Sequence, residues 1–83
     1  MYREDKQAIL DAICEALRLT SASGTGNPLV EIRYIQKPNG TELARPIFEN
    51  GTGEDGYYDV NITCDSGIAI FKDIVKQFIN VVW

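Results

Sequence analysis

Residues 29–50, LVEIRYIQKPNGTELARPIFEN, are the stretch of sequence that decides the fold. β-branched, aromatic and aliphatic residues dominate both ends, which predicts strands over 29–36 and 41–49. Between them, Pro38 presets the first central position of a type I turn, and Gly40 supplies the left-handed residue of a bulged hairpin. The stretch therefore predicts an antiparallel hairpin.

The apolar residues of this hairpin also predict its register. The register that aligns one apolar face has Lys37 facing Thr41, with the opposed pairs Tyr34–Ala44, Ile32–Pro46 and Val30–Phe48. On the other face Arg33 comes opposite Arg45, an unfavourable contact unless Glu31 or another acid lies alongside. Pro46 has no amide hydrogen, so its strand is expected to be bulged there or to lie at an edge.

The residues that follow the hairpin predict a third strand. YYDVNITC, residues 57–64, alternates apolar and polar side chains, as a strand with one buried face does. The side chains expected on the buried face are Tyr58, Val60, Ile62 and Cys64.

Helices are predicted at both ends of the chain. Residues 2–20 contain no proline or glycine, and their apolar side chains recur every fourth residue, as in an amphipathic helix. A second apolar stripe extends over residues 66–82, with Asp65 or Ser66 as the helix N-cap. The two predicted stripes are Ile9, Ile13 and Leu17, and Ile70 or Phe71, Ile74, Phe78 and Val82.

This order of elements predicts a single α+β domain over residues 1–83. The economical arrangement is αβββα, a three-stranded antiparallel sheet with both helices on one face. A chain of 83 residues leaves little room for a large active-site cleft beside its core.

The sequence lacks the residues that several kinds of catalytic and binding site require. Without histidine the chain has neither the commonest general base nor the commonest metal ligand. Its glycine clusters carry no lysine, so they do not form a phosphate-binding loop, and GTGEDG lacks the spacing of a calcium loop. Paired carboxylates at a glycine-rich tip are a weak basis for catalysis. We therefore expect no enzymatic activity, no metal and no cofactor.

The N-terminus and the cysteines favour a cytoplasmic protein. MYREDKQAIL is charged from its third residue and resembles neither a signal peptide nor a membrane span. Cys14 and Cys64 match no zinc spacing, and both are expected to be reduced, buried thiols.

The negative charge of the chain is concentrated in one segment. Residues 46–71 contain five acids and no lysine or arginine, a net charge of −5. The remaining residues carry seven acids and eight bases, a net charge of +1. These acids either solvate a loop and cap a helix, or form a patch that binds a basic protein surface with a tyrosine as its anchor. The candidate partner-binding residues are Glu49, Glu54, Asp55, Tyr57 and Asp59.

Two comparisons of organisation bear on function. The order helix, three strands, helix is shared with double-stranded RNA-binding domains, but CDSGIAIFKD stands where that family carries a lysine cluster, so direct nucleic-acid binding is not expected. In size, acidity and its acidic loop, the chain is similar to some phage and mobile-element inhibitors, including certain anti-CRISPR proteins. This similarity implies an inhibitor that occupies a basic, nucleic-acid-binding groove of a protein partner.

A structural homodimer is the alternative hypothesis. Its interface would combine the C-terminal VVW with the second face of the sheet. The sheet residues assigned to this surface are Leu29, Ile35, Leu43 and Ile47.

Overall fold

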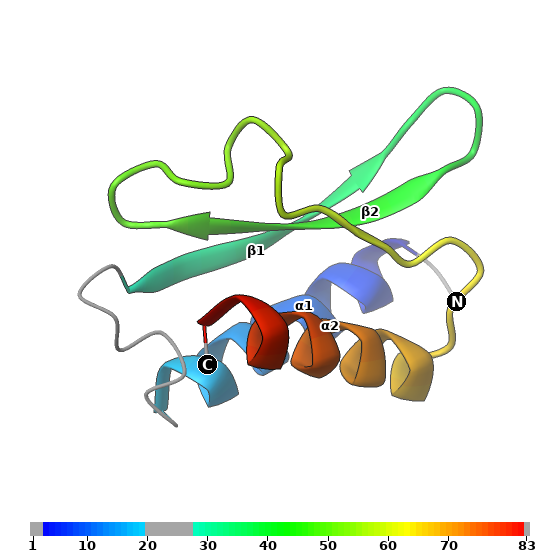
Figure 1. The fold of residues 1–83 in the computed structure, drawn as a ribbon. Helices are drawn as coiled ribbons and strands as arrows, with labels where there is room; N and C mark the ends of the chain where they lie inside the picture. Colours follow the sequence, from blue (N-terminus) through cyan, green and yellow to red (C-terminus); the bar gives the residue numbers. More distant parts are fainter. Residues whose placement is uncertain (1–2, 20–27, 83) are drawn as a thin grey trace.

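The computed structural model describes residues 3–19 and 28–82 and has the predicted order of elements. Both helices cover one face of a three-stranded antiparallel sheet with the strand order β1-β2-β3 (Figure 1). The elements are α1 (Arg3–Leu19), β1 (Leu29–Gln36), β2 (Glu42–Phe48), β3 (Val60–Asn61) and α2 (Gly67–Val82). The αβββα prediction is confirmed.

The hairpin of β1 and β2 has the predicted register along most of its length. Tyr34 pairs with Ala44, and the turn closes with the hydrogen bond from Lys37 N to Thr41 O, 2.8 Å. A bulge between residues 29 and 31 places Leu29, rather than Val30, opposite Phe48. The prediction was wrong at this end because one extra residue in β1 reverses the alternation of its side chains. Val30 is consequently 51% exposed, and Leu29 is fully buried in the core.

The third strand is much shorter than the predicted 57–64. Only Val60 and Asn61 pair with β2. Local turns lie on both sides of β3 and use backbone N–H groups that a longer strand would pair. Before the strand, Asp59 N donates to Gly56 O at 3.1 Å, and after it, Thr63 N donates to the Asn61 carboxamide at 2.9 Å. The alternation in this segment nevertheless marked a buried position correctly, since Ile62 is fully buried.

The core fills the space between the helices and one face of the sheet. Apolar residues from both helices, β1, β2 and the β3 segment meet there. Of the predicted helical stripes, Ile13, Leu17, Ile70 and Ile74 are buried, Ile9 is partly buried and Phe71 is exposed, whereas the side chains of Phe78 and Val82 lie outside the described residues. Burial of each large side chain contributes about 1.5–3 kcal/mol to stability. The core cluster consists of Leu10, Ile13, Cys14, Leu17, Leu29, Ile32, Tyr34, Ala44, Phe48, Ile62, Ile70 and Ile74.

A side chain of α1 protects the outer edge of β1. Gln7 Nε2 donates to Ile32 O at 3.0 Å, and Gln7 Oε1 accepts from Tyr34 N at 2.8 Å. The carboxamide thus supplies the two hydrogen bonds that a neighbouring strand would supply. This part of the edge cannot pair with another chain unless Gln7 is displaced.

Over residues 3–19 and 28–82, no helix is both long and apolar enough to cross a membrane.

Candidate functional site

The acidic segment forms a folded loop between β2 and β3. It lies over the sheet face opposite the helices (Figure 1). Successive turns hold it: Gly51 N donates to Phe48 O at 2.9 Å, Glu54 N to Gly51 O at 3.2 Å, and Gly56 N to Gly53 O at 3.0 Å. Because each turn closes on the preceding one, residues 49–59 have a defined backbone path. We call them the acidic loop.

Gly53 is where the loop packs most closely on β2. Its φ is +95°, and a Cβ atom at this position would lie 2.1 Å from Pro46 O. Thr52 O also accepts a hydrogen bond from Phe48 N at 2.9 Å. Only glycine combines this φ with such close approach of two backbones. The GTGEDG sequence therefore reflects packing of the loop, rather than ligand binding by its glycines.

Three of the five predicted binding residues gather at the tip of the acidic loop. Glu54, Asp55 and Tyr57 are exposed and line an open hollow of about 440 Å³ that also includes Tyr58. Tyr57 is 79% exposed, an unusual position for an aromatic side chain. Its ring contacts Tyr58 edge-on, with centroids 4.8 Å apart, and Tyr58 in turn contacts Phe48. The exposed ring is thus connected to the core.

Asp59, the fourth predicted residue, is engaged within the protein. Its carboxylate accepts two hydrogen bonds from the Arg45 guanidinium, each 2.9 Å long, and the contact is largely buried. Asp59 raises the pKa of Arg45 by this hydrogen bonding. Asp59 is therefore a structural partner of β2, and its charge is neutralised locally. The expected repulsion between Arg33 and Arg45 is relieved in the same way, since Arg33 pairs with Glu31.

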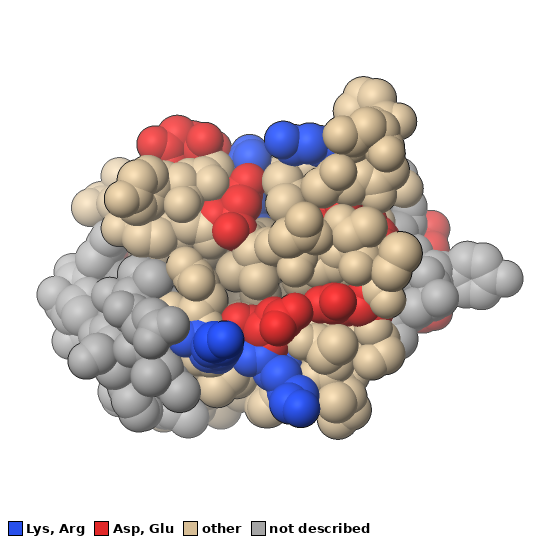
Figure 2. Space-filling model, turned by 45° about the vertical axis from the view of Figure 1, so that its right-hand side comes forward, with Lys and Arg blue, Asp and Glu red and all other residues tan. Residues whose placement is uncertain are grey.

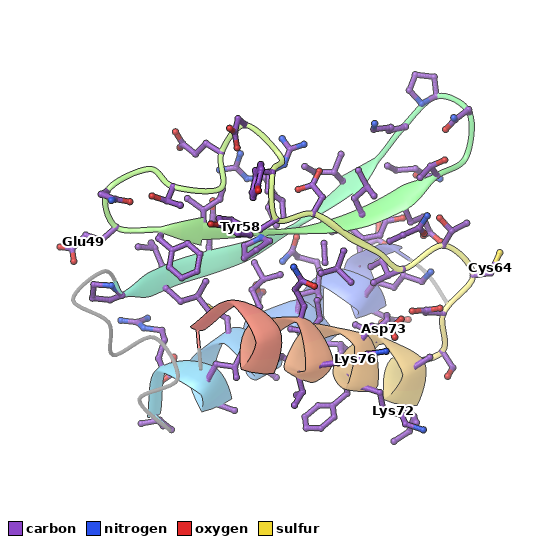
Figure 3. The ribbon with its side chains drawn as sticks, viewed as in Figure 1. Glu49, Tyr58, Cys64, Lys72, Asp73 and Lys76 are labelled. Atoms are coloured by element: carbon purple, nitrogen blue, oxygen red, sulfur yellow. The ribbon has the colours of Figure 1, made fainter. Side chains whose placement is uncertain are left out.

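Glu49, the fifth predicted residue, lies apart from the others. It follows the end of β2, and its backbone N donates to Pro28 O at 2.9 Å. Figure 3 shows its side chain pointing outward, away from Tyr58. In Figure 2, acidic and basic side chains lie next to one another on the visible face, without one continuous acidic surface. The patch that the structure brings together is therefore smaller than the sequence suggested: Glu54, Asp55 and Tyr57.

A second group of charges, which sequence analysis missed, is buried between α1 and the sheet. Lys6 Nζ donates to Glu42 Oε1 at 2.7 Å, with the two side chains 4% and 15% exposed. The Tyr34 hydroxyl donates to the other carboxylate oxygen, and Cys64 N donates to Oε1 at 3.1 Å. Hydrogen bonds from Lys6 and Tyr34 lower the pKa of Glu42 to about 2. Lys6, Tyr34 and Glu42 form what we call the buried charge cluster.

The position of Lys6 in the sequence did contain a signal. Lys6 precedes Leu10, Ile13 and Leu17 by four, seven and eleven residues, so it belongs to the apolar stripe of α1. A lysine in such a stripe is expected to have a buried acidic partner. The identity of that partner, Glu42, depended on the tertiary fold.

Cys64 was predicted to be buried, and the structure contradicts this. The residue is exposed, and its side chain points into solvent (Figure 3). Its φ of 62° turns the chain between the end of β3 at Asn61 and the start of α2, and its backbone N donates to Glu42. Cys14 is buried as predicted, and burial raises the pKa of its thiol.

Two further carboxyl groups lie at the start of α2. Ser66, whose hydroxyl accepts from Ala69 N at 3.3 Å, is the N-cap, so Asp65 does not have that role. Within the described residues, Asp65 Oδ2 is buried and has no hydrogen-bond donor. Burial raises the pKa of Asp65, and the neighbouring carboxyl of Asp73 raises it further. A proton on either carboxyl would complete a hydrogen bond between them.

We expect Asp65→Asn to stabilise the protein at pH 7. A raised pKa means that the folded state favours the protonated acid, so the stabilising contribution is lost as the pH rises through the folded-state value. Asparagine retains the shape, carries no charge and can donate to Asp73. Urea denaturation should give an increase on the order of 1 kcal/mol in the free energy of unfolding at pH 7.

That increase should shrink as the pH falls toward 3.8, the ordinary pKa of the carboxyl. The exposed substitution Asp5→Asn is the control and should have little effect. An Asp65→Asn protein no more stable than wild type at pH 7 would contradict the assignment.

The buried charge cluster and the acidic loop differ in what they can do chemically. The buried charge cluster has carboxylate, ammonium and hydroxyl groups, but these groups hydrogen-bond to one another. Lys6 is also buried and therefore inaccessible to a substrate. Among the described residues, no set of three or more acidic or cysteine side chains is arranged to hold a metal ion. The acidic loop offers exposed carboxylates, an aromatic ring and a hollow, which suit recognition of a cation-bearing surface.

No family model matches the chain, no curated protein is detectably similar to it in sequence, and no solved structure is detectably similar to its fold.

Proposed function

We propose that this domain is a non-enzymatic protein-interaction module whose acidic loop binds a basic surface of a partner protein. The observation that carries the proposal is Tyr57, an aromatic ring 79% exposed on a folded loop and flanked by Glu54 and Asp55. An aromatic anchor beside charged residues is typical of the residues that contribute most to protein interfaces. Because turns fix the loop backbone, binding would cost little conformational entropy.

The proposed binding residues are narrower than the acidic segment as a whole. Glu54, Asp55 and Tyr57 make the direct contacts. Asp59 acts through Arg45, which also donates to Glu54 O at 3.4 Å and so supports the loop. Glu49 extends the acidic charge toward the end of β2. A partner whose lysine or arginine side chains enter the hollow would meet carboxylates and the tyrosine ring together.

The partner could itself be a nucleic-acid-binding protein. An inhibitor that presents carboxylates to a basic groove, as the similarity in organisation to anti-CRISPR proteins implies, is the narrower form of this proposal. Direct binding of nucleic acid by the acidic loop is not expected, since a phosphate backbone would be repelled.

Charge reversal of the loop tip tests the proposal. The substitution Glu54→Lys with Asp55→Lys should reduce capture of the partner from a lysate of source cells by about 100-fold, because both contacts become repulsive. Tyr57→Ala should reduce capture about tenfold or more through loss of the anchor. Both variants should retain wild-type circular dichroism, since these side chains are exposed. Because Asp55 Oδ1 accepts a hydrogen bond of 3.0 Å from Tyr57 N, Glu54→Lys alone is the charge reversal that leaves this loop contact intact, and it should also reduce capture.

The matched control is Glu4→Lys with Asp5→Lys, an adjacent exposed pair on α1 that gives the same change in net charge. Wild-type capture should fall with added salt, as expected for exposed charges. If the loop variant captures the same proteins as the α1 control, the acidic loop is not the binding site.

The surface predicted for the alternative, a homodimer through the second sheet face, is largely covered. The bulge turns Leu29 into the core, and Leu43 and Ile47 are also buried. Gly53 of the acidic loop lies against Pro46 and Ile47, so the loop protects this part of the sheet. Trp83, the last residue of VVW, lies outside the described residues, as do the side chains of the two valines.

A further inference from the structure

Both helices carry large exposed apolar side chains. Five are exposed in the described residues, and three of them belong to α1 or α2: Leu19 at 77%, Ile68 at 73% and Phe71 at 49%. The helices face the sheet with their buried stripes, so these side chains lie on the outer surface of the helix pair. Exposed apolar groups on adjacent elements are typical of an interaction surface.

The outer surface of α1 carries exposed alanines and a row of mostly acidic side chains, which ends at Arg18 in the last turn. Ala8 and Ala12 lie one turn apart and are exposed, as are Asp11 and Glu15 on the adjoining row. Asp11 accepts a hydrogen bond of 2.9 Å from Gln7, whose carboxamide reaches the outer edge of β1. The acidic row is therefore on the flank of α1 that is farther from α2, and the alanines are nearer to α2.

The outer surface of α2 has the opposite properties. Ile68 and Phe71 protrude, and Lys72 and Lys76 lie one turn apart on the adjoining row, all exposed. Figure 3 shows Lys72 extending from α2 away from the sheet and Lys76 beside Asp73, with α1 behind α2. Asp73 points instead toward the sheet, near Asp65. The basic row is thus on the flank of α2 that is farther from α1.

Across the helix pair, the rows therefore follow the order acidic and then apolar on α1, apolar and then basic on α2, and the apolar row of α1 consists of Ala8 and Ala12 with Leu19 at its C-terminal end. A rotation of 180° about an axis along the middle of this surface maps the acidic row onto the basic row. The same rotation places the row of α2 that contains Ile68 and Phe71 against the row of α1 that contains Ala8 and Ala12. A surface that is complementary to itself in charge and shape fits a second copy of the same chain.

We propose that the outer surface of the helix pair is a homodimer interface in which α1 of each copy packs on α2 of the other. The pairs formed are Lys72 and Lys76 of one copy with Asp11 and Glu15 of its partner, twice per dimer. The acidic loop lies on the opposite side of the sheet, so both loops of the dimer stay accessible. The dimer is independent of the loop's function and would present two copies of the loop.

Paired charge reversals test this interface. Sedimentation velocity should show a concentration-dependent dimer for the wild-type chain. Lys72→Glu with Lys76→Glu should weaken self-association at least about tenfold, because acids then face acids at both contacts. Asp11→Lys with Glu15→Lys should weaken it similarly. An equimolar mixture of the two variants should form a heterodimer, since every contact between them again joins opposite charges.

Further variants separate the interface from general effects. Phe71→Glu should give a monomer with wild-type helicity. Because Asp11→Lys also removes the contact from Gln7, Glu15→Lys alone provides a second reagent that leaves this contact intact. Glu54→Lys with Asp55→Lys should leave the dimer unchanged, so failure of this proposal can be distinguished from failure of the proposed function. A wild-type chain that is monomeric up to ~1 mM, or variants that do not restore association on mixing, would overturn the interface.

Discussion

Lys6→Met is expected to lower the free energy of unfolding at pH 7 by about 3 kcal/mol, since it leaves a buried carboxylate without its cation. Glu42 would keep the hydrogen bonds from Tyr34 and Cys64, but these do not replace a full positive charge. A small domain has a total stability of about 5–10 kcal/mol, so the loss would be a large fraction of it. Urea denaturation followed by circular dichroism measures the change.

The pH dependence of stability identifies the cause. The pKa of Glu42 is lowered from 4.5 to about 2, so its contribution is complete above the unfolded value of 4.5 and is lost as the pH falls toward 2. Lys6→Met should raise this pKa, because the largest cause of its lowering is removed. The difference between wild type and variant should therefore shrink on acidification.

Two controls accompany this experiment. Lys37→Met removes an exposed lysine from the hairpin turn and should change stability by less than about 0.5 kcal/mol. Lys6→Met with Glu42→Gln removes both charges and should recover part of the loss, since a neutral amide is much less costly to bury. Equal losses for Lys6→Met and Lys37→Met would mean that the buried pair contributes nothing.

The parts of the fold that sequence predicted well depend on local chemistry. The KPNG turn and the alternation around it gave the register from Ile32–Pro46 to the turn, and the facing Arg33 and Arg45 correctly required acidic neighbours. Helical periodicity identified both helices and four of the six core residues that they contribute, Ile13, Leu17, Ile70 and Ile74. In these cases each residue's environment is determined by neighbours in sequence or by one hairpin partner.

The errors arose where long-range contacts compete with local pattern. Periodicity cannot reveal the bulge beside Leu29, because one inserted residue leaves the composition of the strand unchanged. The alternation at 57–64 predicted burial of Ile62 correctly, but local turns took hydrogen bonds that pairing with β2 would have used. β3 consequently ended at Asn61, and Cys64 turned out to solvent.

In the candidate site too, sequence predicted the features that depend on local residues and missed those that depend on tertiary contacts. The sequence located the acidic charge, and Glu54, Asp55 and Tyr57 do gather at one hollow. It could not show that Asp59 is neutralised by Arg45, because these residues meet only through the packing of the loop on β2. Net charge counts acids and bases along the chain, whereas the field at a surface depends on which of them are already paired.

Packing of the acidic loop on β2 leads to the second large expected effect. Gly53→Ala should destabilise the protein by about 3 kcal/mol through backbone strain and steric overlap. The new Cβ would lie 2.1 Å from Pro46 O, which is a backbone atom and cannot rotate away. The loop must therefore lift from the strand. Amide chemical shifts should change mainly over residues 46–59, and partner capture should fall with them.

Gly40→Ala is a matched control because Gly40 has nearly the same φ as Gly53. Its φ is +90°, compared with +95° at Gly53, but nothing lies within 4 Å of the position that a Cβ atom would occupy there. It should therefore incur only the cost of a positive φ, about 1 kcal/mol. The difference between the two variants measures how strongly contact with β2 holds the acidic loop. If both lose the same stability, and Gly53→Ala captures the partner normally, then the close approach to Pro46 does not give the loop the shape that binding requires.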